Sequence, residues 1–178
     1  MNGKAGQPSF IKIERQLPAR PWKVLRLITR IADFSQYMPN VKKSQIIEKT
    51  STGAITEWLV EIDGLWIRWR QRDVFDFKNF TVSFKAIEGD IEQFEGCWIF
   101  KKGQGESTDV TIEAKVRLGI PIIEDVVGDI LEFRVRKNFE MMLMAMEENL
   151  LRQRYQLPSG EIARDVKGFV VMGHPYNF

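Results

Sequence analysis

The order of hydrophobic and polar positions predicts a strand, a helical connection, a long series of strands and one long helix. Residues 9–17 (SFIKIERQL) alternate between apolar and polar side chains, which predicts a strand that ends before Pro18. After Pro21, apolar residues recur at helical spacing as far as residue 32, and a second short helical turn is predicted to end near Pro39. The first forty residues therefore predict one strand followed by two short helices.

In the middle of the chain, residues 41–118, apolar residues recur at every second position, which predicts an antiparallel meander. Asp63-Gly64 is the strongest turn signal, because this dipeptide favours a two-residue hairpin of type I′. That hairpin pairs residues of matching character: Trp58 with Trp69 on an apolar face, and Glu57 with Arg70 on the other. A slip of one residue would bury charged side chains, so the pattern specifies the register.

Two more turns extend the same sheet. Lys78-Asn79 predicts another two-residue turn, which places Asp73 opposite Phe84 on the face that holds the tryptophans. Around Gly89 a two-residue turn would bury a charge and expose an aromatic ring, so a loop of three or five residues, or a bulge, is predicted instead. With that loop, the next strand adds further residues to the apolar face: Phe94, Gly96, Trp98 and Phe100.

The last regular segment carries one helical stripe of apolar residues from residue 122 to about residue 153. A helix of this length needs a large apolar surface, and the inner face of the sheet is the surface available to it. The predicted fold is α+β: a curved antiparallel sheet of about seven strands wrapped around a long C-terminal helix. Residues 9–153 form the predicted domain, residues 1–8 a flexible N-terminus, and residues 154–178 an extension without an assigned role.

Composition narrows the classes of function. A chain of 178 residues with a net charge of +2 predicts one domain and requires no nucleic-acid partner. The single cysteine, Cys97, excludes an internal disulfide, and the single histidine, His174, excludes zinc motifs with two histidines. No apolar run approaches the length of a membrane-spanning helix, and no signal peptide is evident. We therefore expect a cytoplasmic protein without a metal or a cofactor.

The order of the elements is that of the helix-grip fold, and four segments resemble the START-like (SRPBCC) superfamily. The resemblance is to its polyketide cyclase/dehydrase and coenzyme Q-binding groups, and it covers roughly residues 9–153. The segments that carry it are IADFSQYMP at 31–39, WRQRD at 69–73, EGD at 88–90 and FEGCWIF at 94–100. The resemblance implies a hydrophobic ligand cavity between the curved sheet and the long helix.

Aromatic side chains on the inner face and methionines on the helix are predicted to face each other across that cavity. They would either fill the core or line a ligand site, and the flexible methionine side chain suits a wall that adapts to its ligand. The candidate ligand-binding residues are Trp58, Trp69, Gln71, Asp73, Phe84, Phe94, Trp98, Phe139, Met142 and Met146.

Gln71 and Asp73 are the most informative polar residues. Side chains alternate along a strand, so the predicted hairpin register places both of them on the apolar face with Trp69. A buried carboxylate is unfavourable unless it is paired or its pKa shifts. Asp73 would therefore bind a polar group of a ligand, act as an acid or base, or pair with a backbone amide or an arginine where its strand leaves the core.

Arg68, Arg70 and Arg72 alternate along the strand and are predicted to lie on its opposite face. Glu57 lies across from Arg70 in the predicted hairpin, which predicts a row of solvated ion pairs between the two strands. In the polyketide aromatase/cyclases that the chain resembles, an inward-facing arginine orients the polyketide, and Gln71 stands at the position that aligns with it. This departure argues against cyclase chemistry. Arg72 would reach the cavity only through a bulge, and it joins Asp73 as a candidate catalytic residue.

Three functions follow as hypotheses. The first is binding or transport of a hydrophobic small molecule, such as an aromatic polyketide, a quinone or a lipid. The second is a polyketide cyclase/dehydrase-type enzyme. The third is a ribosome-associated or other protein-interaction module, which would have a filled core and an outer arginine face. Both a monomer and a homodimer are compatible with the sequence.

Overall fold

A computed structural model describes residues 8–62, 64–117 and 121–155, and the described side chains of the last helix begin at Glu132. Helices and strands follow in this order: β1 (Ser9–Leu17), α1 (Pro21–Ile28), the 3-10 turn η1 (Ile31–Asp33), α2 (Phe34–Tyr37), β2 (Val41–Lys49), β3 (Gly53–Ile62), β4 (Leu65–Asp76), β5 (Thr81–Gly89), β6 (Gln93–Lys102), β7 (Thr108–Arg117) and α3 (Pro121–Tyr155). The predicted N-terminus, apart from residue 8, and nearly all of the predicted C-terminal extension lie outside the described residues.

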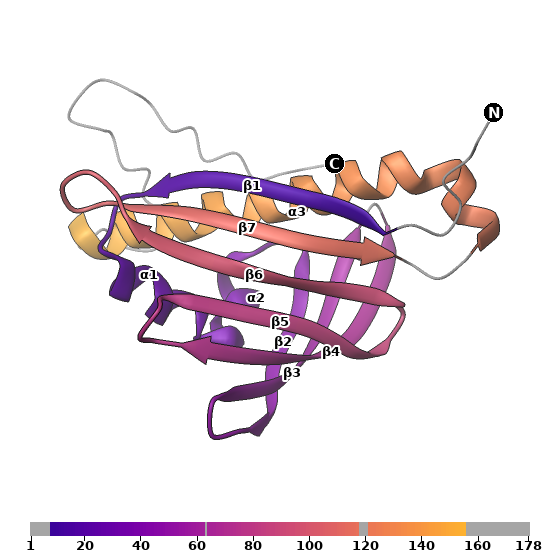
Figure 1. Cartoon of the computed structure of the whole chain (residues 1–178), viewed down its shortest axis with the longest axis horizontal. Helices are drawn as coiled ribbons and strands as arrows, with labels where there is room; N and C mark the ends of the chain where they lie inside the picture. Colours follow the sequence, from indigo (N-terminus) through magenta and orange to yellow (C-terminus); the bar gives the residue numbers. More distant parts are fainter. Residues whose placement is uncertain (1–7, 63, 118–120, 156–178) are drawn as a thin grey trace.

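All seven strands join one antiparallel sheet in the order β1-β7-β6-β5-β4-β3-β2. Figure 1 shows α3 running alongside β1 and β7, while β2, β3 and β4 turn away from them. The sheet is therefore strongly curved, and α3 lies within its curve. This is the predicted helix-grip arrangement. None of the helices in the described part of the chain is both long and apolar enough to cross a membrane.

The predicted register of the β3–β4 hairpin is confirmed. Ile62 pairs with Leu65 across the turn, and Trp58 pairs with Trp69. Gly64 has a φ of +81°, in the left-handed region that this tight turn requires and that glycine adopts without strain. Since residues two apart share a face, this one turn decides which side chains of β3 and β4 point toward α3.

The other two turns also keep the predicted register. β4 ends at Asp76, whose carboxylate accepts hydrogen bonds from the backbone amides of Lys78 (3.0 Å) and Asn79 (2.9 Å), so regular pairing stops one pair earlier than predicted. Three residues separate β5 from β6, as one of the predicted alternatives requires. Trp98 is consequently buried against the inner face.

The helices differ from prediction mainly near the N-terminus. The predicted helix over residues 22–32 is two elements, because α1 ends at Ile28 and η1 begins at Ile31. The backbone amide of Arg30 bonds to the carbonyl of Leu27, three residues back, which tightens the last turn and ends the α-helix. α3 matches its predicted range within two residues, and its buried stripe consists of Val135, Phe139, Leu143, Met146 and Leu150.

Candidate ligand-binding cavity

A cavity of about 110 Å³ lies between the concave face of the sheet and α3. Of the residues that line it, four have polar side chains other than an indole: Asn40, Gln71, Asp73 and Asn138. The remaining wall is aliphatic or aromatic and comes from α1, α2, the inner strands and α3. A concave apolar space with few polar groups is typical of a small-molecule site.

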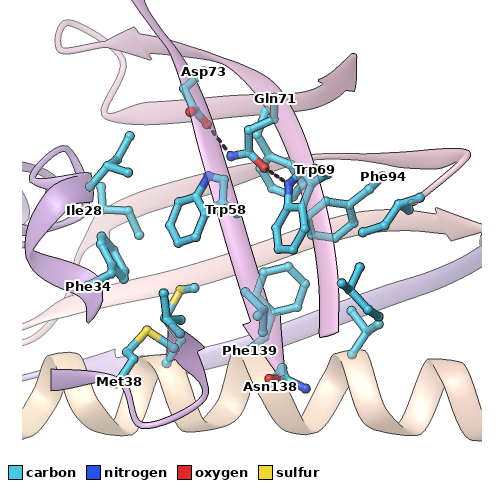
Figure 2. Close-up of a pocket in the computed structure, with 18 of the residues that line it drawn as sticks. Ile28, Phe34, Met38, Trp58, Trp69, Gln71, Asp73, Phe94, Asn138 and Phe139 are labelled. Carbon is cyan, nitrogen blue, oxygen red and sulfur yellow. Dashed lines mark hydrogen bonds between the residues drawn. The ribbon is translucent and has the colours of Figure 1, made fainter. Parts of the chain in front are cut away.

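Aromatic rings form much of the wall. Trp58 and Trp69 are stacked at 6.0 Å between ring centroids, with an interplanar angle of 7°. Phe94 meets Trp69 edge-on at 5.7 Å, and Phe139 of α3 lies 6.0 Å from Phe94. These separations are those of favourable aromatic pairs. The rings therefore connect the sheet to α3 around the cavity (Figure 2).

The two tryptophans are tied together by a chain of hydrogen bonds that converges on Asp73. Trp69 Nε1 donates to Gln71 Oε1 (2.8 Å), and Gln71 Nε2 donates to Asp73 Oδ1 (2.7 Å). On the other side, Trp58 Nε1 donates to Thr56 Oγ1 (2.9 Å), whose hydroxyl donates to Asp73 Oδ2 (2.6 Å). Figure 2 shows Gln71 and Asp73 side by side at the sheet end of the cavity.

Asp73 is 3% exposed. The described residues that donate hydrogen bonds to its carboxylate are both neutral. Burial raises the pKa of its carboxyl to about 6, and the hydrogen bonds from Thr56 and Gln71 oppose that shift. The sequence predicted a backbone amide or an arginine as its structural partner. The structure places two neutral side chains there instead, so the cavity wall holds a carboxyl group that titrates near neutral pH.

A second polar group lies on the opposite wall. Asn138 of α3 donates from Nδ2 to the carbonyl of Arg134 (2.9 Å), and its Oδ1 accepts from Nδ2 of Asn40. Asn40 precedes β2. Its own Oδ1 is buried, and no described residue donates to it. The cavity wall therefore has two polar regions. The side chains around Asp73 are hydrogen-bonded to one another, whereas Oδ1 of Asn40 accepts no hydrogen bond from a described residue.

The outer face of the same hairpin holds the other buried carboxylate, Glu57. Its oxygens accept from Lys43 (3.0 Å), Gln45 (3.1 Å), Arg68 (2.8 Å) and Arg70 (3.2 Å). The hydrogen bonds from Arg68 and Lys43 lower the pKa of Glu57 to about 2. The predicted ion pairing across these strands is therefore present, and Arg68 and Arg70 are engaged in it.

Nine of the ten candidate ligand-binding residues line the cavity: Trp58, Trp69, Gln71, Asp73, Phe84, Phe94, Trp98, Phe139 and Met142. Met146, one turn further along α3, is fully buried in the core outside this lining. Arg72 does not turn inward. The irregularity between β4 and β5 leaves Ile87 of β5 without a partner, so β4 keeps its alternation and Arg72 stays exposed on the outer face.

Three polar residues of the site were missed by the sequence analysis. Thr56 has the same parity as Trp58, so the hairpin register alone could have placed it on the inner face. Asn138 lies beside Phe139 on the predicted apolar stripe, where a polar side chain is a detectable exception. Asn40 follows a proline in a connection, and no local pattern identifies it.

The chain is similar to known proteins both in sequence and in fold. The family described as polyketide cyclase/dehydrase and lipid transport matches residues 17–147. The ribosome association toxin RatA of Rickettsia prowazekii (strain Madrid E) is 22% identical over 135 residues, which cover 74% of this chain and 89% of RatA.

Two solved structures are similar over nearly their whole length. The protein TTHA0849 from Thermus thermophilus has a TM-score of 0.77 and 26% identity, over 82% of this chain and 99% of its own. The Zhui aromatase/cyclase of a Streptomyces species has a TM-score of 0.76 and 15% identity, over 83% of this chain and 96% of its own. The predicted resemblance to START-like helix-grip proteins is confirmed by these matches.

Proposed function

Because the chain belongs to the polyketide cyclase/dehydrase and lipid transport family, we propose that it binds or transports a compact hydrophobic small molecule, such as an aromatic polyketide, a quinone or a lipid. The observation that carries this proposal is the cavity of about 110 Å³ with an almost wholly apolar wall. Transfer of an apolar molecule from water into such a space is favourable without any covalent step. The aromatic walls supply flat surfaces against which a ring system stacks.

The enzyme-class alternative is a polyketide cyclase or dehydrase in which Asp73 transfers a proton. A carboxyl group with a pKa of about 6 suits that role near neutral pH. However, both of its oxygens already accept hydrogen bonds, and Arg72, the other candidate, is exposed on the outer face. This arrangement favours binding over catalysis.

The name of the Rickettsia relative supports a third candidate, association with the ribosome. Such a module would use the outer face of the sheet, where Arg68 is exposed and Arg70 is half-buried. Both of these arginines are bound to Glu57, and Arg70 also lies 3.1 Å from Glu88. Their charge is therefore largely balanced within the protein, which makes this face a weaker candidate than the cavity.

The decisive experiment is native mass spectrometry of the protein purified from cells, followed by identification of any bound molecule. The test variant is Met142→Trp, which places a larger ring in the cavity wall, and the control is Met144→Trp, at an exposed position of the same helix. We expect a bound hydrophobic molecule in the wild type and in Met144→Trp, and its loss in Met142→Trp.

The result that contradicts the proposal is equally specific. An unliganded mass, together with no thermal shift on adding quinones, fatty acids or aromatic polyketide mimics, would indicate a core that takes no ligand. The protein-interaction hypothesis would then become the stronger one. Equal ligand occupancy in both methionine variants would place the ligand outside this cavity.

A further inference from the structure

Asn40 is one of the residues that line the cavity, and its Oδ1 is a buried acceptor to which no described residue donates a hydrogen bond. From it we propose that the ligand is an uncharged apolar molecule carrying a hydroxyl or N–H group, and that Asn40 accepts a hydrogen bond from this group. This inference rests on the proposed function and specifies the chemical class of the ligand.

The orientation of the Asn40 amide follows from its neighbours. Asn138 Nδ2 donates to the carbonyl of Arg134, so the group that Asn138 presents to Asn40 is its oxygen, Oδ1. An oxygen requires a donor, and the amide nitrogen of Asn40 is the donor in reach. Reversing the Asn40 amide would bring two acceptors face to face. Oδ1 of Asn40 is therefore the atom that receives no hydrogen bond from the described residues. Leaving a buried acceptor unpaired is unfavourable.

The polar groups at the other end of the cavity already have partners in the protein. Gln71 and Thr56 each direct a donor at Asp73, and each accepts a hydrogen bond from a tryptophan indole. Figure 2 shows Asn138 on α3 at the opposite end from Gln71 and Asp73, with aromatic rings between them. A ligand that fills the apolar middle would present its donor to Asn40.

The charges around the cavity specify a neutral ligand. Asp73 is the only ionisable side chain among the described lining residues, and none of them is a lysine, arginine or histidine. A carboxylate or phosphate entering this space would lose its hydration without meeting a counter-ion among the described lining residues, and it would be repelled by ionised Asp73. We therefore expect the cavity to exclude fatty-acid anions.

Three probes of nearly equal shape test the inference: 2-fluoronaphthalene, which is apolar, 2-naphthol, which adds a hydroxyl donor, and 2-naphthoate, which is an anion at pH 7. Their affinities for the full chain are measured by calorimetry. We expect 2-naphthol to bind about fivefold to tenfold more tightly than 2-fluoronaphthalene, which is the effect of one neutral hydrogen bond. We expect 2-naphthoate to bind most weakly of the three.

The matching variant replaces both amides, as Asn40→Leu with Asn138→Leu. The double change is needed because Asn40→Leu alone would free Asn138 Oδ1 to act as a substitute acceptor. We expect the preference for 2-naphthol over 2-fluoronaphthalene to be lost in this variant. The two affinities are compared within the variant, because both substitutions also alter the cavity wall. Asn149→Leu, on the same helix but outside the cavity lining, should keep that preference.

The outcomes separate this inference from the function on which it rests. If 2-fluoronaphthalene binds and the hydroxyl adds nothing, or if the preference survives in the double variant, Asn40 is not the recognition group, although the cavity still binds apolar molecules. Binding of 2-naphthoate as tightly as 2-naphthol would overturn the requirement for a neutral ligand. Binding of none of the three would overturn both proposals. If the double variant fails to fold, the comparison of the three probes on the wild type decides.

Discussion

The two faces of the β3–β4 hairpin each bury one carboxylate, and they hold it in opposite ways. On the outer face, the Glu57 side chain is 6% exposed, and its pKa is lowered to about 2 by arginines and a lysine. On the inner face, Asp73 is 3% exposed, and its pKa is raised to about 6 among neutral donors. Burial is the largest cause of the raised pKa of Asp73, whereas hydrogen bonds from Arg68 and Lys43 are the largest causes of the lowered pKa of Glu57. None of the described residues that line the inner cavity is a lysine, arginine or histidine.

The largest expected contrast between the faces concerns two tryptophans of β4. Trp69 is buried in the aromatic wall, whereas Trp66 is 53% exposed on the outer face. We expect Trp69→Ala to lower the free energy of unfolding by about 3–5 kcal/mol, because it removes a packed ring and its hydrogen bond to Gln71. Trp66→Ala should change it by less than about 0.5 kcal/mol.

Urea denaturation followed by circular dichroism measures both variants without relying on tryptophan emission. Similar losses for the two substitutions would mean that the outer face is also packed against something, and the comparison between the faces would fail.

The next effect is the pH dependence that Asp73 confers. Its pKa is 3.8 ordinarily and about 6 in the fold, so the folded protein binds the proton more tightly than the unfolded chain does. Stability should therefore fall as the pH rises from about 4 to above 6, by about 3 kcal/mol for this group. This is the reverse of the behaviour of an aspartate stabilised by cations.

Replacing Asp73 with asparagine isolates that effect. Asp73→Asn resembles the protonated form, so its free energy of unfolding should lack the decrease between pH 4 and pH 7. Asp109→Asn, at an exposed carboxylate of β7 that accepts from Gln16, should retain it. A wild-type stability that stays level or rises across this range would show that Asp73 does not titrate as described.

The smallest effect is expected for Glu57 on the outer face. Its pKa is lowered from 4.5 to about 2, so its ionised form stabilises the fold above pH 4.5, and this contribution is lost as the pH falls toward 2. We expect Glu57→Gln to lower the urea midpoint at pH 7, by less than Trp69→Ala does, because the cations around it are left to repel one another. Added salt should shrink the difference.

Glu48→Gln is the matched control for Glu57, since Glu48 is exposed on β2 and takes part in no described ion pair. It should leave the midpoint unchanged at every salt concentration. Equal effects of the two substitutions would indicate that net charge, rather than the ion-pair cluster around Glu57, determines the result.

Most of the architecture could be predicted because strand alternation and turn chemistry are local. Asp63-Gly64 specified which residues of β3 and β4 share a face, and that parity brought Trp58, Gln71 and Asp73 into the cavity. The bulge is different. It depends on pairing between β4 and β5, so the sequence left open whether Arg72 would turn inward.

The site was harder to predict where it depends on contacts between distant segments. Asn40 and Asn138 meet only because the connection before β2 is folded against α3, and the two residues are 98 positions apart. Met146 fits the helical stripe as well as Met142 does, but periodicity does not show where along α3 the cavity ends. Periodicity assigns a face, and the tertiary fold decides which residues of that face meet a ligand.

The hydrogen-bond chain around Asp73 also has an observable consequence. It begins at the indole N–H groups of Trp58 and Trp69, and these two rings, with Trp98, account for three of the five tryptophans in the chain. Indole emission responds to neighbouring charge and to contact with other rings. The intrinsic fluorescence of the unlabelled protein should therefore respond both to protonation of Asp73 and to the binding of a molecule in the cavity.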